Sequence, residues 1–455
     1  MSGPSRPEPV GSARLAEIEA QILGRAPEHD IVPTLDRVAA VMDLLGDPQR
    51  TFGVIHVTGT NGKTSTTRII EALCREHGLR TGRFTSPHLH SMRERIALDG
   101  APIDPAALVE AWAEIEPLVE LVDQRSLDEG GPRLTFFEVL AILGYAVFAD
   151  APVDVAVVEV GMGGTWDATN VADGTVSVLT PVDVDHTRFL GATPGQIAQE
   201  KAGIVKPGSI LVVGVQDDEV ADILARRAEQ VGARRYAADT DFGVTAREVA
   251  LGGQLISLRG LAGDYPDLFL PLHGAHQADN CALAVAAVEA FLGGGERALD
   301  VDVLRAGLAK VTSPGRLEVV RRSPTILVDA AHNPHGMRAL AEALADGFAF
   351  TRLVAVVAVF ADKDALAMLE ALESVVDHVV VTRNTSPRSM SPLELGELAA
   401  EVFGAERVSV VPALPDALEE AVTVAERDGL GGGVIATGSV VTAADVRALL
   451  GVAAE

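Results

Sequence analysis

A glycine-rich segment, Thr58-Gly-Thr-Asn-Gly-Lys-Thr-Ser-Thr66, carries the residue types that hold a phosphate group. It follows an apolar run at residues 54–57 and opens a helix-compatible run at residues 66–73, so the sequence predicts a strand, a loop and a helix start. Gly59 and Gly62 let the backbone bend around an anion, and the helix N-terminus adds partial positive charge. The segment therefore predicts a phosphate-binding loop.

The chemistry of such a loop assigns roles to its side chains. Lys63 is expected at the outer phosphates of a nucleotide and Thr64 at a magnesium ion. The common form of the loop is G-x-x-x-x-G-K-[ST], and Val57 stands where its first glycine would fall. The nucleotide contacts expected from the loop itself are Gly59, Thr60, Asn61, Gly62, Lys63, Thr64 and Ser65.

Acidic side chains follow two further apolar runs. Glu159 lies near the end of residues 153–160, and a glycine loop comes directly after it. An acid at the carboxyl end of a parallel strand, beside a phosphate loop, is placed to hold Mg²⁺ directly or through water. Ser86, in a turn fixed by Pro87, could present its hydroxyl to the same metal.

A second polar cluster follows residues 175–179. Asp183, Asp185 and His186 come together there, and His186 could complete the metal site or contact a transferred phosphate. Of the three, His186 is the selected candidate.

Four arginines at positions 80, 83, 93 and 95 stand out in an acidic chain. They lie just beyond the predicted helix of the phosphate loop and indicate an anionic substrate, because arginine pairs bidentately with carboxylates. Arg93 is taken as the substrate contact.

The last third of the chain repeats the strand–acid–turn pattern. Asp329 follows residues 325–328 and could accept a hydrogen bond from a ribose hydroxyl, while His332 could face the phosphates across a cleft. Arg316, at a Pro-Gly break, could reach a nucleotide bound between two domains.

Apolar β-branched runs alternate with helical segments, which is typical of a mostly parallel α/β sheet. Strands are expected at residues 54–57, 153–160, 175–179, 210–215, 325–328, 353–359, 378–381 and 434–436, and helices at 105–122 and 135–148. Residues 241–272 favour an antiparallel hairpin region. We expect an α/β fold with a large P-loop-containing, mostly parallel-sheet domain at residues 1–312 and a smaller C-terminal Rossmann-like α/β domain at residues 313–455.

The composition argues against several other kinds of binding partner and site. The chain has 455 residues, 48% of them hydrophobic, and a formal charge of −27, which argues against a nonspecific grip on nucleic acid or anionic lipid. Two cysteines without C-x-x-C spacing indicate neither a disulfide framework nor a structural zinc site. The N-terminal residues lack the apolar core of a signal peptide. The sequence thus predicts a cytoplasmic protein that binds neither membrane nor nucleic acid.

Taken together, the motifs resemble the folylpolyglutamate synthase and dihydrofolate synthase family, which is related to the Mur ligases, over nearly the whole chain. The matching segments are Thr58–Thr64, Thr85–Leu89, Thr135–Glu138, Glu159–Gly164, Asp167–Asn170, Asp185–Thr187, Glu200–Ile204, His273–Gln277 with Asn280, Pro314–Glu318 and Asp329–Pro334.

The resemblance implies an ATP-dependent ligase that joins L-glutamate to dihydropteroate or to a reduced folate through an acyl phosphate. It implies that Thr64, Ser86, Glu159 and His186 serve magnesium, that Lys201 is carbamylated, and that Lys63, His186 and Lys201 support catalysis. A potassium ion and a monomeric state are also expected. Nucleotide contacts beyond the loop are expected from Gln277, Asn280, Arg316, Asp329 and His332, and substrate contacts from Phe136, Phe137, Asp167 and Arg93.

Two positions depart from the family pattern. Thr165 stands where the family usually has arginine, which questions the shape or charge of the pterin side, and Ala330 stands where it usually has glycine. Two alternatives stay open: a Mur-type ligase acting on a peptidoglycan precursor, and a non-catalytic nucleotide-binding regulator. A switch GTPase is weaker, because no N-K-x-D-type guanine segment is found.

Overall fold

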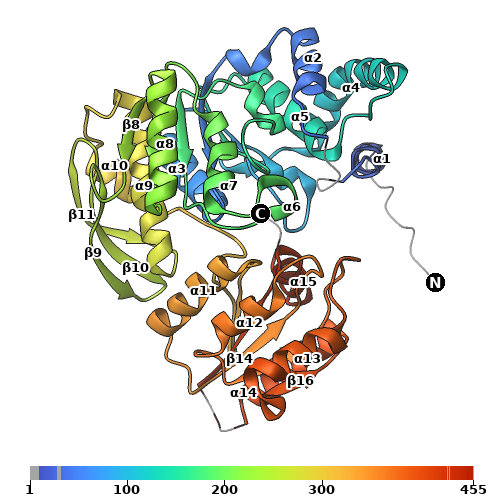
Figure 1. Ribbon diagram of the computed structural model, residues 1–455, viewed down its shortest axis with the longest axis vertical. Helices are drawn as coiled ribbons and strands as arrows, with labels where there is room; N and C mark the ends of the chain where they lie inside the picture. The colour runs from blue at the N-terminus through green and yellow to red at the C-terminus, as the bar shows by residue number, and fades with distance from the viewer. Residues whose placement is uncertain (1–9, 28–31, 428, 430, 454–455) are drawn as a thin grey trace.

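The computed structural model describes residues 10–27, 32–427, 429 and 431–453. The N-terminal residues on which the signal-peptide expectation depends lie largely outside these ranges. Two α/β units stack along the long axis of the molecule (Figure 1), which confirms the predicted fold class. Among the described helices, none combines the length and hydrophobicity that a bilayer crossing requires.

The larger unit is built on an eight-stranded sheet with the order β4-β3-β2-β5-β1-β6-β7-β8. Strands β2, β5, β1, β6, β7 and β8 run parallel, while β3 and β4 extend the sheet antiparallel. The strands are β1 (Gly53–Thr58), β2 (Thr81–Phe84), β3 (Ile96–Leu98), β4 (Ala101–Pro102), β5 (Val155–Glu159), β6 (Val176–Leu179), β7 (Ile210–Val213) and β8 (Arg234–Ala237).

Both faces of this sheet are covered, because its central strands carry apolar side chains on both sides. One face packs against α3 (Lys63–Glu76), α9 (Ala275–Gly293) and α10 (Val301–Leu308). The other face packs against α5 (Phe136–Asp150), α7 (Pro194–Lys201) and α8 (Asp218–Val231). The outer helices are α1 (Val10–Leu23), α2 (Asp36–Leu44), α4 (Pro105–Asp128) and the short α6 (Thr187–Leu190).

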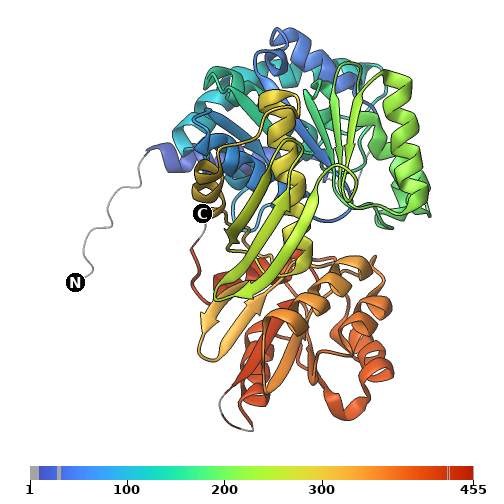
Figure 2. The ribbon, with the colours of Figure 1, turned by 90° about the vertical axis from the view of Figure 1, so that its left-hand side faces the viewer.

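A separate antiparallel sheet joins the larger unit, as predicted for residues 241–272. It consists of β9 (Gly243–Ala250), β10 (Gly253–Arg259) and β11 (Asp264–Leu270). Figure 2 shows these strands reaching from the larger unit toward the smaller one. Arg247 on β9 forms an ion pair with Asp346 on α11 (Pro334–Gly347) of the smaller unit.

The smaller unit has a six-stranded sheet with the order β12-β13-β17-β14-β15-β16, antiparallel only at β12. Its strands are β12 (Glu318–Arg322), β13 (Thr325–Val328), β14 (Arg352–Val357), β15 (His378–Val381), β16 (Val408–Val410) and β17 (Gly432–Thr437). Helices α11 (Pro334–Gly347), α12 (Ala365–Leu372) and α13 (Pro392–Phe403) cover one face. Helices α14 (Leu414–Ala425) and α15 (Val440–Leu449) cover the other.

The predicted strands all occur with small shifts at their ends, whereas β2, β3, β4, β8, β12 and β16 were not predicted. Their sequences explain the omission. The β2 segment Thr-Gly-Arg-Phe and the β8 segment Arg-Arg-Tyr-Ala lack an apolar run, although neighbouring strands pair with both. The division at residues 312 and 313 stays a prediction; α10 ends at Leu308 and β12 begins at Glu318.

The separate core of the smaller unit yields a stability prediction. Leu369 on α12 is fully buried in that core, whereas Leu393 on α13 is 72% exposed. Leu369→Ala should lower the free energy of unfolding by about 2–5 kcal/mol, because it leaves a cavity among packed side chains. Leu393→Ala, the same chemical change, should shift it by less than about 0.5 kcal/mol. Urea unfolding followed by circular dichroism measures both, and equal losses would contradict the assigned core.

Candidate active site

The phosphate-loop segment lies between β1 and α3, as predicted. Gly59 has φ 145° and Gly62 has φ 85°. A Cβ on Gly59 would lie 1.8 Å from Thr180 Oγ1, and a Cβ on Gly62 would lie 2.5 Å from Asn280 Oδ1. Both positions therefore need glycine, for the backbone angle and for the close approach of their neighbours.

Two lysine amines meet on one carbonyl of this loop. Lys63 Nζ lies 3.1 Å from Gly59 O and 3.0 Å from Thr60 O, and Lys201 Nζ lies 2.6 Å from Gly59 O. Burial lowers the pKa of Lys63, and burial together with the charge of Lys63 lowers the pKa of Lys201 well below its ordinary value. Lys201 is thereby favoured as a neutral amine, the form that can react as a nucleophile.

Glu159 connects three of the expected metal-site residues. It ends β5 in register with Val57 of β1, so it lies beside the loop. Thr64 Oγ1 donates to Glu159 Oε1 at 2.9 Å, and the backbone N–H of Ser86 donates to Glu159 Oε2 at 3.2 Å. Burial raises the pKa of Glu159, although Lys63 and Thr64 offset part of that effect. A buried carboxylate with the Thr64 hydroxyl close by fits a divalent cation, which would neutralise its charge.

His186 approaches this region from α6, where it takes a left-handed backbone conformation (φ 50°). Burial lowers the pKa of His186 to about 3, so the imidazole is neutral and could serve as a ligand. Within the described residues, no three His, Cys, Asp or Glu side chains gather in metal-binding geometry. The expected set contains only one carboxylate and one imidazole, so a cation there would take other ligands from hydroxyls, water and phosphate.

The nucleotide candidates from the larger unit form a chain of hydrogen bonds. Asn280 donates to Gln277 Oε1 at 3.1 Å, and Gln277 donates to Ser65 Oγ at 3.2 Å. Ser65 Oγ lies 2.9 Å from the hydroxyl of Ser313. These bonds hold Ser65, Gln277 and Asn280, three of the predicted nucleotide contacts, together at the first turn of α3.

Arg316 and Asp329 lie at the junction of the two units. Asp329 accepts from the N–H groups of Leu317 (2.7 Å) and Ala331 (2.8 Å), which fixes its carboxylate. Burial lowers the pKa of Arg316, and the nearby charges of Asp329 and Glu159 partly restore it. His332 is oriented by a 2.9 Å contact between its Nδ1 and Ala330 O.

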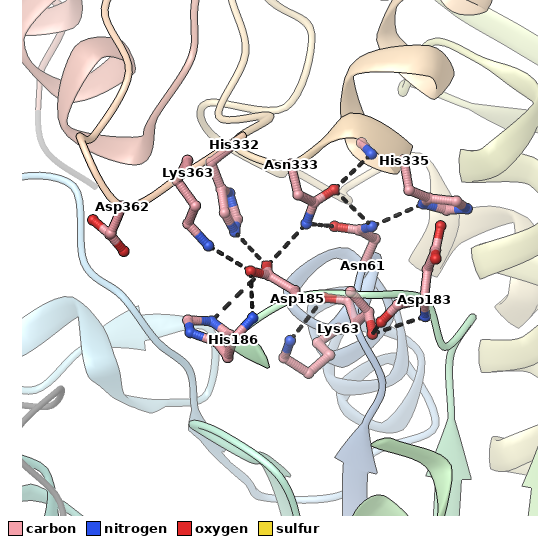
Figure 3. Close-up of polar contacts among 12 residues, drawn as sticks. Asn61, Lys63, Asp183, Asp185, His186, His332, Asn333, His335, Asp362 and Lys363 are labelled. Carbon is pink, nitrogen blue, oxygen red and sulfur yellow. Dashed lines mark hydrogen bonds and ion pairs between the residues drawn. The ribbon is translucent and has the colours of Figure 1, made fainter. Parts of the chain in front are cut away.

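Asp185, in the larger unit, contacts several residues of the smaller unit (Figure 3). Its carboxylate accepts from Asn333 Nδ2 at 3.0 Å and from Lys363 Nζ at 2.5 Å, and His332 Nε2 lies 3.5 Å away. Burial raises the pKa of Asp185, but the hydrogen bond from His332 and the charge of Lys363 outweigh it, so the pKa falls well below its ordinary value. Asp185 is therefore ionised.

The loop itself also reaches the smaller unit. Asn61 Nδ2 donates to Asn333 Oδ1 at 3.2 Å and lies 2.8 Å from His335 Nδ1, while Asn333 donates back to Asn61 Oδ1 at 3.1 Å. These contacts attach the phosphate loop to the first turn of α11 (Figure 3).

A cavity of about 590 Å³ is lined by both units. It collects most of the predicted site residues, namely Thr60, Asn61, Gly62, Lys63, Thr64, Ser65, Ser86, Phe137, Glu159, Asp167, His186, Gln277, Asn280, Arg316, Asp329 and His332. A smaller cavity of about 30 Å³ behind the loop is lined by Gly59 and Lys201, together with Lys63 and His186.

Arg93 and Phe136 are not brought into either cavity. Arg93 donates to Ile103 O at 2.8 Å, because the short helical turn that contains it points its side chain toward β4. Arg95 lines the cavity from the same turn, and its guanidinium lies 4.9 Å from the centre of the Phe136 ring. Of the four arginines in the cluster, Arg95 alone lines this cavity, and spacing alone did not identify which arginine faces inward.

The structure accommodates both residues that depart from the family pattern. Thr165 is exposed, and its hydroxyl donates to Glu200 O at 3.0 Å, so its side chain contributes nothing to the cavity wall. Ala330 does not occupy the left-handed region, so an alanine fits there without strain.

Several residues near the site were not selected from the sequence. Lys363 follows residues 353–359 within Asp-Lys-Asp, so the strand–acid–turn pattern could have indicated it. Arg37 and Glu138 form a buried ion pair of 2.8 Å in the cavity wall near Phe137. Arg37 lies far from every motif in the sequence, and no local signal pointed to it.

The comparisons with known proteins agree with this arrangement. Residues 134–288 match the Mur ligase middle domain, and residues 315–440 match the Mur ligase, glutamate ligase domain. The chain is 49% identical to dihydrofolate synthase/folylpolyglutamate synthase of Mycobacterium tuberculosis, over 98% of this chain and 96% of that protein. It is 36% identical to folylpolyglutamate synthase of Lacticaseibacillus casei, over 91% and 94% of the two chains.

Solved structures give the same result in three dimensions. Mycobacterium tuberculosis folylpolyglutamate synthase complexed with ADP has a TM-score of 0.93 at 48% identity, covering 98% of this chain and all of that one. A folylpolyglutamate synthase in complex with AMPPCP and folate has a TM-score of 0.82 at 32% identity, covering 96% of this chain and 99% of that one. The chain belongs to the dihydrofolate synthase/folylpolyglutamate synthase family of the Mur ligases.

Proposed function

We propose that the chain is an ATP-dependent ligase that forms an amide bond between L-glutamate and the carboxylate of dihydropteroate, of a reduced folate, or of both. The observation that carries the proposal is that the larger cavity joins the phosphate loop to Phe137 and to the smaller unit. The structurally similar folylpolyglutamate synthase described above is a complex with AMPPCP and folate. Of two relatives that this chain resembles over more than nine-tenths of its length, one is named for both activities and the other as a folylpolyglutamate synthase.

The first half-reaction transfers the γ-phosphoryl group of ATP to the substrate carboxylate, giving an acyl phosphate and ADP. Two anions must approach each other, so positive charge is needed between them. Lys63 leaves its loop carbonyls to bind the phosphates, and backbone N–H groups of residues 59–64 and the N-terminus of α3 support the same charge.

Thr64, Ser86, Glu159 and His186 would hold magnesium, whose Lewis acidity would stabilise charge on the transferred phosphate. Gln277, Asn280, Arg316, Asp329 and His332 would hold the rest of the nucleotide from both units. The Phe137 ring offers a flat apolar surface for the pterin. In the second half-reaction the glutamate amine attacks the acyl carbon, phosphate leaves, and the amine loses a proton.

The remaining expectations stay predictions of the proposal. They are a potassium ion, a carbamylated Lys201, a monomeric state, a cytoplasmic location, and no binding to nucleic acid or membrane. A Mur-type ligase on a peptidoglycan precursor and a non-catalytic nucleotide-binding regulator are the alternatives that the first assay separates.

The direct test is ADP release by the purified protein with Mg²⁺-ATP and L-glutamate. The assay is run with dihydropteroate, with tetrahydrofolate monoglutamate, and with no pterin substrate. We expect release that requires glutamate and at least one pterin; release with both substrates means a bifunctional enzyme. ATP binding without release in either case would contradict the proposal and favour one of the alternatives.

Lys63→Ala should reduce ligation at least about a thousandfold, because the amine is expected at the transferred phosphate. The circular dichroism spectrum should not change, since Lys63 contacts only loop carbonyls in this structure. Lys310→Ala is the matched control, because Lys310 is an exposed lysine paired with Glu76 outside both cavities. Undiminished turnover of the Lys63 variant would remove the phosphate-loop assignment.

Carbamylation of Lys201 has its own test. The neutral amine adds CO₂ and releases a proton, and its lowered pKa favours this reaction at neutral pH. We expect a ¹³C carbamate signal when the protein is equilibrated with labelled bicarbonate, lost in Lys201→Gln and lost on acidification. A signal that persists in Lys201→Gln would place the carbamate elsewhere.

A further inference from the structure

A chain of three buried polar side chains runs beneath one wall of the cavity. His56 lies in β1, is fully buried, and faces the layer that contains α5. Its Nε2 lies 2.9 Å from Thr169 Oγ1, and Thr169 Oγ1 donates to Asp167 Oδ1 at 2.5 Å. Asp167 lines the cavity, so the chain connects the central strand of the sheet to the substrate wall.

The donor and the acceptor of each hydrogen bond along these three side chains can be assigned. Burial raises the pKa of Asp167 to about 6, which still leaves the carboxylate mostly ionised at pH 7. An ionised carboxylate only accepts, so the single proton of Thr169 goes to Asp167, and the Thr169 oxygen must accept from His56. Nε2 of His56 therefore carries the proton. Its Nδ1 has no hydrogen-bond partner among the described residues, as expected for a nitrogen without a proton in this position. Burial, with the charge of Lys206, lowers the pKa of His56 to about 3, which keeps the ring neutral.

Asp167 in turn organises the loop around it. Its oxygens accept from the N–H groups of Met162 (2.9 Å) and Thr169 (3.0 Å), and Tyr145 on α5 donates to Thr169 O at 2.6 Å. Most acceptor positions of the carboxylate are thus filled from within the loop. Gly161, Met162, Trp166 and Ala168, which lie within or beside these bonds, line the cavity near Phe137.

We propose that His56 is a positioning residue for the pterin-bearing substrate. It acts through the Thr169 hydroxyl to hold Asp167, and through Asp167 it holds the cavity wall of residues 161–168. This inference rests on the proposed function only in naming the pterin as the group that contacts this wall. His56 itself touches neither substrate nor nucleotide, since it does not line the cavity.

Thr169→Val removes the hydroxyl while keeping the shape of the side chain. The KM for the pterin substrate should rise about tenfold, because a buried hydrogen bond that holds the wall is lost. The KM for ATP and kcat should stay within about twofold of wild type. Thr169→Ser, which keeps the hydroxyl, should restore the wild-type KM. Likewise His56→Leu should resemble Thr169→Val, and His56→Gln, which keeps an N–H donor, should stay close to wild type.

Ser177→Ala is the matched control. Ser177 lies opposite His56 in the neighbouring strand β6, is equally buried, and donates to Ile204 O at 3.1 Å. It is absent from the cavity wall, so its loss should affect stability and leave the pterin KM unchanged. An equal rise in the pterin KM for Ser177→Ala and Thr169→Val would contradict the inference, because His56 would then have a purely structural role. An unchanged pterin KM in Thr169→Val would contradict it as well.

An NMR measurement separates this inference from the proposed function. In ¹⁵N-histidine-labelled protein without substrate, the His56 ring should be neutral at pH 7 with its proton on Nε2. His56→Gln assigns the signal by its disappearance. A proton on Nδ1, or a charged ring, would overturn the inference whether or not the protein ligates glutamate. An inactive wild-type protein with the expected tautomer would instead count against the proposed function alone.

Discussion

The site depends on a carboxylate buried beside a phosphate loop. Burying Glu159 disfavours its charge, so the surrounding structure must supply hydrogen bonds and positive charge. Thr64 and Lys63 of the phosphate loop do so, together with the Ser86 backbone from the turn after β2. They converge because β2, β5 and β1 are parallel neighbours, whose carboxyl ends meet at one edge of the sheet. The parallel register of three strands is thus what makes an acid, a glycine loop and a hydroxyl into one site.

A second constraint lies between the two units. Asp185 and Asn61, both from the larger unit, share Asn333 as a partner, and Asp185 also contacts Lys363 and His332 of the smaller unit. Each contact is polar and direct, and the cavity has walls from both units only while the units are in contact. A ligase that forms an acyl phosphate benefits from this arrangement, because excluding water protects the intermediate from hydrolysis. The carboxylate that joins the units lies next to His186, so docking of the units and assembly of the site are physically linked.

Sequence patterns predicted the strands whose own residues form a continuous apolar run. Strands such as β5 and β14 are continuous apolar runs because both faces are covered by helices. The edge strand β8 and the short β2 were not predicted, because pairing with a neighbour, and not their own composition, keeps them extended. The same distinction holds for the site. Residues that end a strand or form the loop were found, whereas Lys363 and the Arg37–Glu138 pair were not selected.

The sequence by itself determined the phosphate loop, the two α/β units, and the family to which the chain belongs, because glycine positions, strand-end acids and apolar runs are local in the chain. Only the tertiary structure decided which of several equivalent side chains faces the cavity. Arg95 faces inward and Arg93 does not, although both belong to one short turn. It also showed that Asp167 receives a directed hydrogen-bond chain from His56, more than a hundred residues earlier. Side-chain direction and contacts between distant segments depend on how the layers pack, and no local pattern encodes them.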